Sequence, residues 1–179
     1  MIPNYLTISR IFLIFPVLIF SSDGPSLNNW IALSLFVIAG ITDHLDGYVA
    51  RKTDSTSNMG ALLDLVADKL LIIITLFYFV SYSSSLLLLI PSMIIIIREI
   101  IISSFRQFIA EKERENLVKV TFIAKSKTTL QIFAVSFLII SPNFGQPFFF
   151  LTISLFWLAA YVSLHSLYGY LKSYGNFIK

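Results

Sequence analysis

Four aspartates stand in two pairs within the stretch DHLDGYVARKTDSTSNMGALLDLVAD (43–68). Asp43 and Asp46 are three positions apart, and Asp64 and Asp68 are four apart, so each pair shares one face of a helix. The chain has only ten acidic residues among 179 and is 56% hydrophobic. Neighbouring carboxylates in an apolar chain repel one another and lose hydration, and a bound cation relieves both penalties. The spacing therefore predicts a metal site.

The ligand atoms on offer indicate the class of metal. Cysteine is absent, and His44 is the only histidine in this stretch. Carboxylate oxygens suit the hard cations Mg²⁺, Mn²⁺ and Ca²⁺ better than zinc. Four carboxylates could hold two such cations, the arrangement that stabilises the attacking and leaving oxygens in phosphoryl transfer. The alternative is that the acids form interfacial salt bridges with the nearby Arg51, Lys52 and Lys69.

Small residues between the acids favour a ligand pocket over salt bridges. Gly47 and Ala50 follow the first aspartate by about one and two helical turns, and Gly60 precedes the third by about one turn. Missing side chains let a backbone or a flat ligand approach closely. A helix beginning near Asn58 would direct free N–H groups toward a phosphate. Arg51 adds forked donors that suit a diphosphate.

Membrane-spanning helices are the elements expected to position these residues. The chain is 13% charged, against about 25% in soluble domains. A short connection between the second and third apolar runs makes those two runs antiparallel neighbours, which brings the two acidic pairs together. Runs suited to spans of about 20 residues cover 5–21, 29–50, 61–81, 85–108, 128–141 and 147–171. The fifth run is the shortest, and the alternative start of its helix lies in the polar stretch before it.

The distribution of basic residues predicts how the chain is oriented. The turn-rich segments 21–29, 81–85 and 141–147 contain no Lys or Arg, so all thirteen basic residues belong to the other side or to spans opening toward it. Basic loops stay in the cytoplasm, so both termini are expected there. We therefore expect an all-α integral membrane protein with six transmembrane helices, forming one domain over residues 1–179. It would lie in the cell (inner) membrane with its acidic site facing the cytoplasm, and we expect no nucleic-acid partner.

The acidic stretch resembles, without gap or substitution, the signature of the CDP-alcohol phosphatidyltransferase family, D-x2-DG-x2-AR-x8-G-x3-D-x3-D. The resemblance implies a six-helix membrane enzyme, usually dimeric, in which an alcohol displaces CMP from a CDP-linked lipid. It also implies two divalent cations, Mg²⁺ or Mn²⁺, held by the four acids, with Asp68 serving in addition as general base. The residues implied for the nucleotide and CDP-lipid site are Asp43, Gly47, Ala50, Arg51 and Gly60.

The signature does not select the acceptor alcohol, so other polar residues must indicate it. Arg10, Arg106, Lys125 and Lys127 bring positive charge toward the cytoplasmic side. Such a cluster suits an acceptor that is itself a phosphate, such as glycerol 3-phosphate, whereas inositol or an amino alcohol would need less charge. The alternative for the two lysines is that they are topological anchors on the cytoplasmic side.

Three further segments resemble one branch of that family, the phosphatidylglycerophosphate synthases: IPNYLTISR (2–10), REIIISSFR (98–106) and KSKTTLQ (125–131). This implies CDP-diacylglycerol and glycerol 3-phosphate as substrates. Another acceptor (inositol phosphate, serine or phosphatidylglycerol) stays open as an alternative. A divalent-cation transporter also stays open, although the acids cluster at one end of their spans and no broken-helix repeat is visible.

Polar residues of the later spans are expected to have structural roles. Arg98 and Glu99 are adjacent in sequence, so they should not face each other and should instead be partners of other helices. His165 is expected to be a packed polar residue, with a role in substrate binding as the alternative, and Trp157 is expected to anchor the chain at the bilayer surface.

Overall fold

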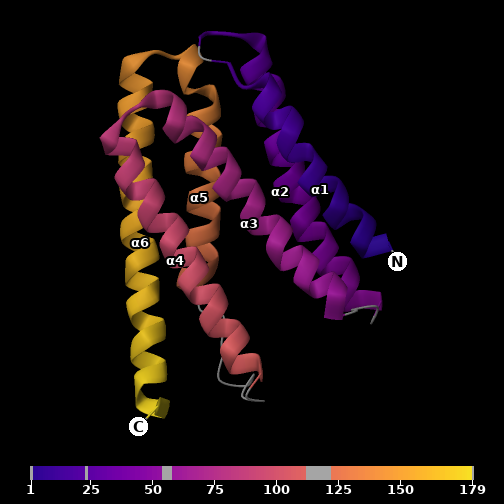
Figure 1. Cartoon of the computed structure of the whole chain (residues 1–179). Helices are drawn as coiled ribbons and strands as arrows, with labels where there is room; N and C mark the ends of the chain where they lie inside the picture. The colour runs from indigo at the N-terminus through magenta and orange to yellow at the C-terminus, as the bar shows by residue number, and fades with distance from the viewer. Residues whose placement is uncertain (1, 23, 54–57, 112–121, 179) are drawn as a thin grey trace. The chain divides into compact units, whose positions relative to one another are not determined.

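The computed structural model (Figure 1) describes residues 2–22, 24–53, 58–111 and 122–178, and within these the side chains of 9–22, 24–42, 66–67, 69–105 and 129–172. The described part of the chain forms six α-helices and a 3₁₀ helix, without strands, as the sequence predicts. The helices are α1 (Ile2–Phe20), α2 (Leu27–Thr53), α3 (Asn58–Ser83), α4 (Leu86–Glu111), α5 (Phe122–Ile140), η2 (Ser141–Asn143) and α6 (Gln146–Ile178).

The residue types at the starts of α3 and α6 suit the beginning of a helix. Asn58, the predicted capping residue, is the first residue of α3. Gly145 precedes α6 with φ of 75°, a left-handed conformation that glycine adopts without steric penalty. Pro147 is the second residue of α6, where its missing N–H breaks no helical hydrogen bond.

A proline inside α4 is compensated by a tryptophan of α6. Pro91 has no N–H to donate to the Leu87 carbonyl, four residues earlier. The Nε1 atom of Trp157 donates to that carbonyl oxygen at 3.1 Å. Trp157 is also 41% exposed, so its ring remains available as the predicted bilayer anchor. One side chain thus repairs a gap in the hydrogen bonding of another helix.

The chain divides into two compact units. The first comprises residues 1–82 and 135–152, and the second comprises 83–134 and 153–179. In the first unit α1 packs against α2 (Figure 1), with buried Val17, Phe36 and Ala39 among its core residues. In the second unit, α4 contributes Leu88 and Ile95 to the core and α6 contributes Phe156 and Ala159.

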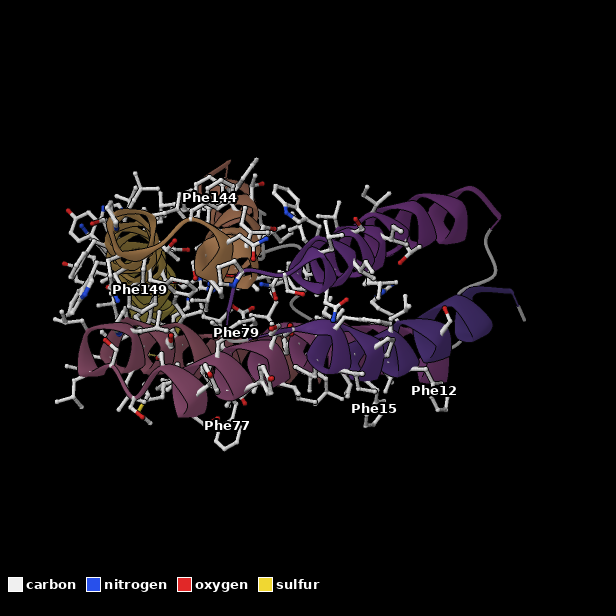
Figure 2. All side chains as sticks on the ribbon, turned by 90° about the horizontal axis from the view of Figure 1, so that it is seen from above. Phe12, Phe15, Phe77, Phe79, Phe144 and Phe149 are labelled. Carbon is white, nitrogen blue, oxygen red and sulfur yellow. The ribbon has the colours of Figure 1, made fainter. Side chains whose placement is uncertain are left out.

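Two helical segments are long and apolar enough to cross a membrane, Leu86–Phe105 of α4 and Gln146–Lys172 of α6. The other apolar helical segments within the described residues are shorter: Ser9–Phe20, Leu27–Thr42, Lys69–Ser83 and Thr129–Asn143. Several large apolar side chains are exposed, and Figure 2 shows Phe12, Phe15 and Phe77 directed outward from their helices. Such a surface suits contact with lipid rather than water.

Candidate active site

The two acidic pairs lie on two helices of the first unit. Asp43 and Asp46 belong to the last turns of α2, and Asp64 and Asp68 belong to the first turns of α3. The backbone is helical at all four positions, as the three- and four-residue spacings require. Their side chains fall outside the described residues, so coordination by these carboxylates stays a prediction.

The opposite ends of these helices are joined by a cluster of hydrogen bonds, here called the polar cluster (Ser21, Ser22, Ser26, Asn29, Tyr78 and Asn143). Asn29, at the start of α2, is fully buried. Its Oδ1 accepts from the Ser22 N–H at 2.8 Å, and its Nδ2 donates to the Gly24 carbonyl at 3.0 Å and to the Asn143 Oδ1 at 2.6 Å. This one amide therefore ties the start of α2 to the loop after α1 and to η2.

Two further contacts extend the polar cluster. Asn143 donates from Nδ2 to the Ser26 carbonyl at 3.0 Å and accepts from the Ser26 N–H at 3.0 Å. Tyr78 of α3 donates from its hydroxyl to the Ser21 carbonyl at 3.3 Å. The end of α1, the start of α2 and the last turns of α3 are thus held at one level.

Distances along each helix can therefore be measured from the polar cluster to the candidate site residues. At a rise of 1.5 Å per residue, Asp43 lies about 21 Å along α2 from Asn29. By the same rise, Asp64 lies about 21 Å along α3 from Tyr78. Helix α2 runs away from the polar cluster, and α3 runs back toward it. The two acidic pairs therefore lie at similar distances from the cluster along their helices. The backbone thus supports the predicted approach of the two pairs.

Arg10 reaches a similar height on α1 and is the one predicted acceptor-site residue whose side chain is described. It lies about 16 Å from Ser21 along the helix. Its side chain is fully buried. Its level matches that of the acids, and its burial means that protein atoms enclose it in this structure, so phosphate binding by Arg10 stays a prediction.

The other predicted site residues also lie in helices, with side chains outside the described set. Gly47, Ala50 and Arg51 belong to α2, and Gly60 is the third residue of α3. The predicted acceptor residues of the second unit are Arg106 on α4 and Lys125 and Lys127 on α5.

The structure corrects two expectations about polar residues of the second unit. Arg98 Nη1 lies 3.1 Å from Glu99 Oε2, so the prediction that these neighbours do not face each other is wrong. A long arginine side chain can fold back along its own helix to reach an adjacent carboxylate. The expectation that Arg98 also has partners on another helix is confirmed by its bonds to Ser163 and Ser166 of α6. The predicted packing of His165 is wrong, because this side chain is exposed in the chain.

Comparison with known proteins agrees with the location of the signature. A model of the CDP-alcohol phosphatidyltransferase family matches residues 1–165. The chain is 36% identical over 173 residues to the CDP-diacylglycerol–glycerol-3-phosphate 3-phosphatidyltransferases of Escherichia coli (strain K12) and Shigella flexneri serotype 5b, covering 96% of this chain and 93% of each relative. The enzyme of the same name from Rickettsia typhi is 36% identical over 179 residues, covering 96% of both chains. The chain belongs to the CDP-alcohol phosphatidyltransferase family.

Proposed function

We propose that this protein transfers the phosphatidyl group of CDP-diacylglycerol to glycerol 3-phosphate, giving phosphatidylglycerophosphate and CMP. The observation that carries the proposal is the match, over nearly the whole chain, to relatives named for this reaction. It is supported by the complete acidic signature on α2 and α3.

Two divalent cations, Mg²⁺ or Mn²⁺, fit the proposed site. The candidate ligands offer only carboxylate oxygens, which hard cations prefer, and the backbone brings the two acidic pairs to similar heights. When bound, the cations would neutralise diphosphate charge and stabilise the charge that develops on the transferred phosphoryl group. The residues proposed to hold them are Asp43, Asp46, Asp64 and Asp68.

The chain's own residues would carry the remaining chemistry. Asp68 takes the proton from the terminal hydroxyl of glycerol 3-phosphate while that oxygen bonds to the lipid-side phosphorus. The bond from this phosphorus to the CMP oxygen breaks, and CMP leaves with the electron pair. Arg51 stabilises the diphosphate, and Gly47, Ala50 and Gly60 leave room for the CDP group.

Positioning of the acceptor is assigned to a second set of residues. A phosphate-bearing alcohol must be held with its hydroxyl directed at the phosphorus, and such orientation can be worth about 7 kcal/mol or more of the barrier. Positive side chains would supply that hold through the acceptor's phosphate. The residues proposed are Arg10, Arg106, Lys125 and Lys127.

The membrane arrangement is proposed from the charge pattern together with the apolar helices. Two helices long enough to span, an exposed apolar surface and the family support a membrane protein. We propose that the whole chain acts as one catalytic domain with six spans in the cell (inner) membrane. Both termini and the acidic ends of α2 and α3 would face the cytoplasm, and two copies would form a homodimer.

The test is CMP release by the purified protein from CDP-diacylglycerol with glycerol 3-phosphate and Mg²⁺. Wild type is compared with Asp68→Asn and with Asp54→Asn, an acid of the same stretch outside the signature. We expect release that requires both the acceptor and Asp68 but not Asp54. Release that depends on another alcohol would overturn the acceptor assignment, and release without any alcohol would indicate hydrolysis instead of transfer.

A further inference from the structure

The second unit contains a buried arginine that the proposed chemistry does not use. Arg98 of α4 is 2% exposed. Its Nε donates to the Ser163 carbonyl of α6 at 3.1 Å, its Nη2 donates to the Ser166 hydroxyl at 2.9 Å, and its Nη1 pairs with Glu99 at 3.1 Å. All three guanidinium nitrogens therefore bind the protein itself.

The third helix of this unit joins the same group of contacts. Gln131 of α5 is 3% exposed, and its Nε2 donates to the Ser163 hydroxyl at 3.3 Å. Ser163 thus accepts from α4 through its carbonyl and from α5 through its hydroxyl. We call Arg98, Gln131, Ser163 and Ser166 the three-helix network.

Stability alone does not account for a charge at this place. Apolar side chains of similar volume hold helices together as well as a buried charged group, or better. The unit already has such a core, with Leu88, Ile95 and Phe156 each at most 2% exposed. Hydrogen bonds add what apolar contacts lack, a fixed rotation and axial register between helices. A charged residue within an apolar span is therefore a candidate for a functional role.

Basic residues proposed to bind the acceptor lie close to the three-helix network along α4 and α5. Arg106 lies about 12 Å beyond Arg98 along α4, and Lys127 lies about 6 Å before Gln131 along α5. α5 starts at the end toward which α4 and α6 run (Figure 1). The network is thus one to two turns from positions that carry the proposed acceptor charges.

We propose that Arg98 is a positioning residue for the acceptor phosphate. By binding α6 from α4, while Gln131 binds the same serine from α5, it fixes the relative register of the helices that carry Arg106, Lys125 and Lys127. Arg98 does not contact the acceptor, because its nitrogens are engaged by Ser163, Ser166 and Glu99. This inference rests on the proposed function.

The test separates acceptor binding from folding by steady-state kinetics. Arg98→Lys keeps the charge but loses the forked geometry, Gln131→Leu removes the link to α5, and Ser166→Ala removes one acceptor. Ser166→Thr keeps the hydroxyl and is the matched control, and Trp157→Phe is a control for lost stability outside the network. For each protein, KM is measured for glycerol 3-phosphate and for CDP-diacylglycerol, together with kcat and Tm.

We expect Arg98→Lys and Gln131→Leu to raise KM for glycerol 3-phosphate about tenfold, because small misplacements weaken binding geometry strongly. KM for CDP-diacylglycerol should stay within about twofold, and Ser166→Thr should match wild type while Ser166→Ala does not. Calorimetric binding of glycerol 3-phosphate without the CDP-lipid should show the same order among the variants.

Two results would overturn the inference. One is an unchanged KM for the acceptor, with activity falling only in proportion to the folded fraction, as Trp157→Phe would show. The other is an equal rise of both KM values. A wild type that uses a different phosphorylated alcohol refutes the proposed function alone, and the same KM comparison is then made with that alcohol. A wild type that uses only an alcohol without phosphate overturns both.

Discussion

At the residue scale, the proposed metal site predicts how cation affinity depends on the number of charged ligands. Asp43→Asn replaces a carboxylate with a neutral amide of nearly the same size. Affinity for hard cations falls as charged ligands are removed, so we expect the Mg²⁺ concentration for half-maximal activity to rise about tenfold or more. The measurement is initial rate against free Mg²⁺ after removal of bound metal by a chelator.

Asp54→Asn is the control for this prediction, because Asp54 lies in the same stretch but outside the signature. It should leave the Mg²⁺ dependence unchanged. An Asp43→Asn enzyme with the wild-type Mg²⁺ dependence would contradict the assignment of Asp43 as a ligand.

Asn29 supports a second prediction at this scale. Asn29→Ala removes three hydrogen bonds of the polar cluster and takes a partner from the Ser22 N–H, the Gly24 carbonyl and the Asn143 side chain, which are part-buried. Each lost hydrogen bond costs about 0.5–1.5 kcal/mol, so we expect a clear fall in the Tm of the detergent-solubilised protein. The neighbouring Asn28 is exposed, and Asn28→Ala should leave Tm nearly unchanged. Equal Tm values for the two variants would show that the polar cluster does not hold the first unit together.

Some of these site and network residues can be predicted from the sequence, and others cannot. The aspartates can be identified because their spacing along one or two helical turns is local. The partners of Asn29 and Arg98 cannot, because Asn143 is 114 positions from Asn29, and Ser166 is 68 positions from Arg98. Which side chains meet depends on how each helix is rotated about its axis. Polar residues inside apolar spans, such as Gln131, are the signal that could have marked the network.

At the element scale, apolar runs locate the helices but not their ends. The fifth run, predicted at 128–141, belongs to a helix that begins at Phe122 and so includes the polar stretch before the run. The last run, predicted at 147–171, belongs to a helix that continues to Ile178. Hydropathy indicates which residues are apolar enough to lie outside water. The helical hydrogen bonding of the backbone can continue through polar residues until a glycine, proline or turn interrupts it.

The contact between α4 and α6 allows a test with a double-mutant cycle. Trp157→Phe removes the donor to the Leu87 carbonyl, and Pro91→Ala restores a backbone N–H that can replace it. We therefore expect Trp157→Phe to cost about 0.6–1.5 kcal/mol in the wild type and much less in the Pro91→Ala background. The measurement is unfolding in mixed micelles. Equal costs in both backgrounds would mean that the indole stabilises α4 by packing alone.

At the scale of the whole molecule, orientation follows from charge and determines which solution the acidic site meets. The segments 21–29, 81–85 and 141–147 lack Lys and Arg, and the opposite side carries the basic residues. Positively charged loops resist translocation, so the basic side should face the cytoplasm. The acidic ends of α2 and α3 lie at the far end from the polar cluster, whose Asn29 and Asn143 belong to the side without Lys or Arg. The orientation therefore predicts that the site faces the cytoplasm.

The absence of cysteine from the chain makes this orientation directly measurable. Gln146→Cys places a thiol on an exposed residue at the start of α6, and Lys119→Cys places one in the stretch between α4 and α5. In intact cells, a membrane-impermeant maleimide should label Gln146→Cys and should label Lys119→Cys only after the membrane is permeabilised. The cysteine-free wild type is the control for background labelling. Labelling of Lys119→Cys in intact cells, with Gln146→Cys protected, would reverse the orientation and place the acidic site on the outer side.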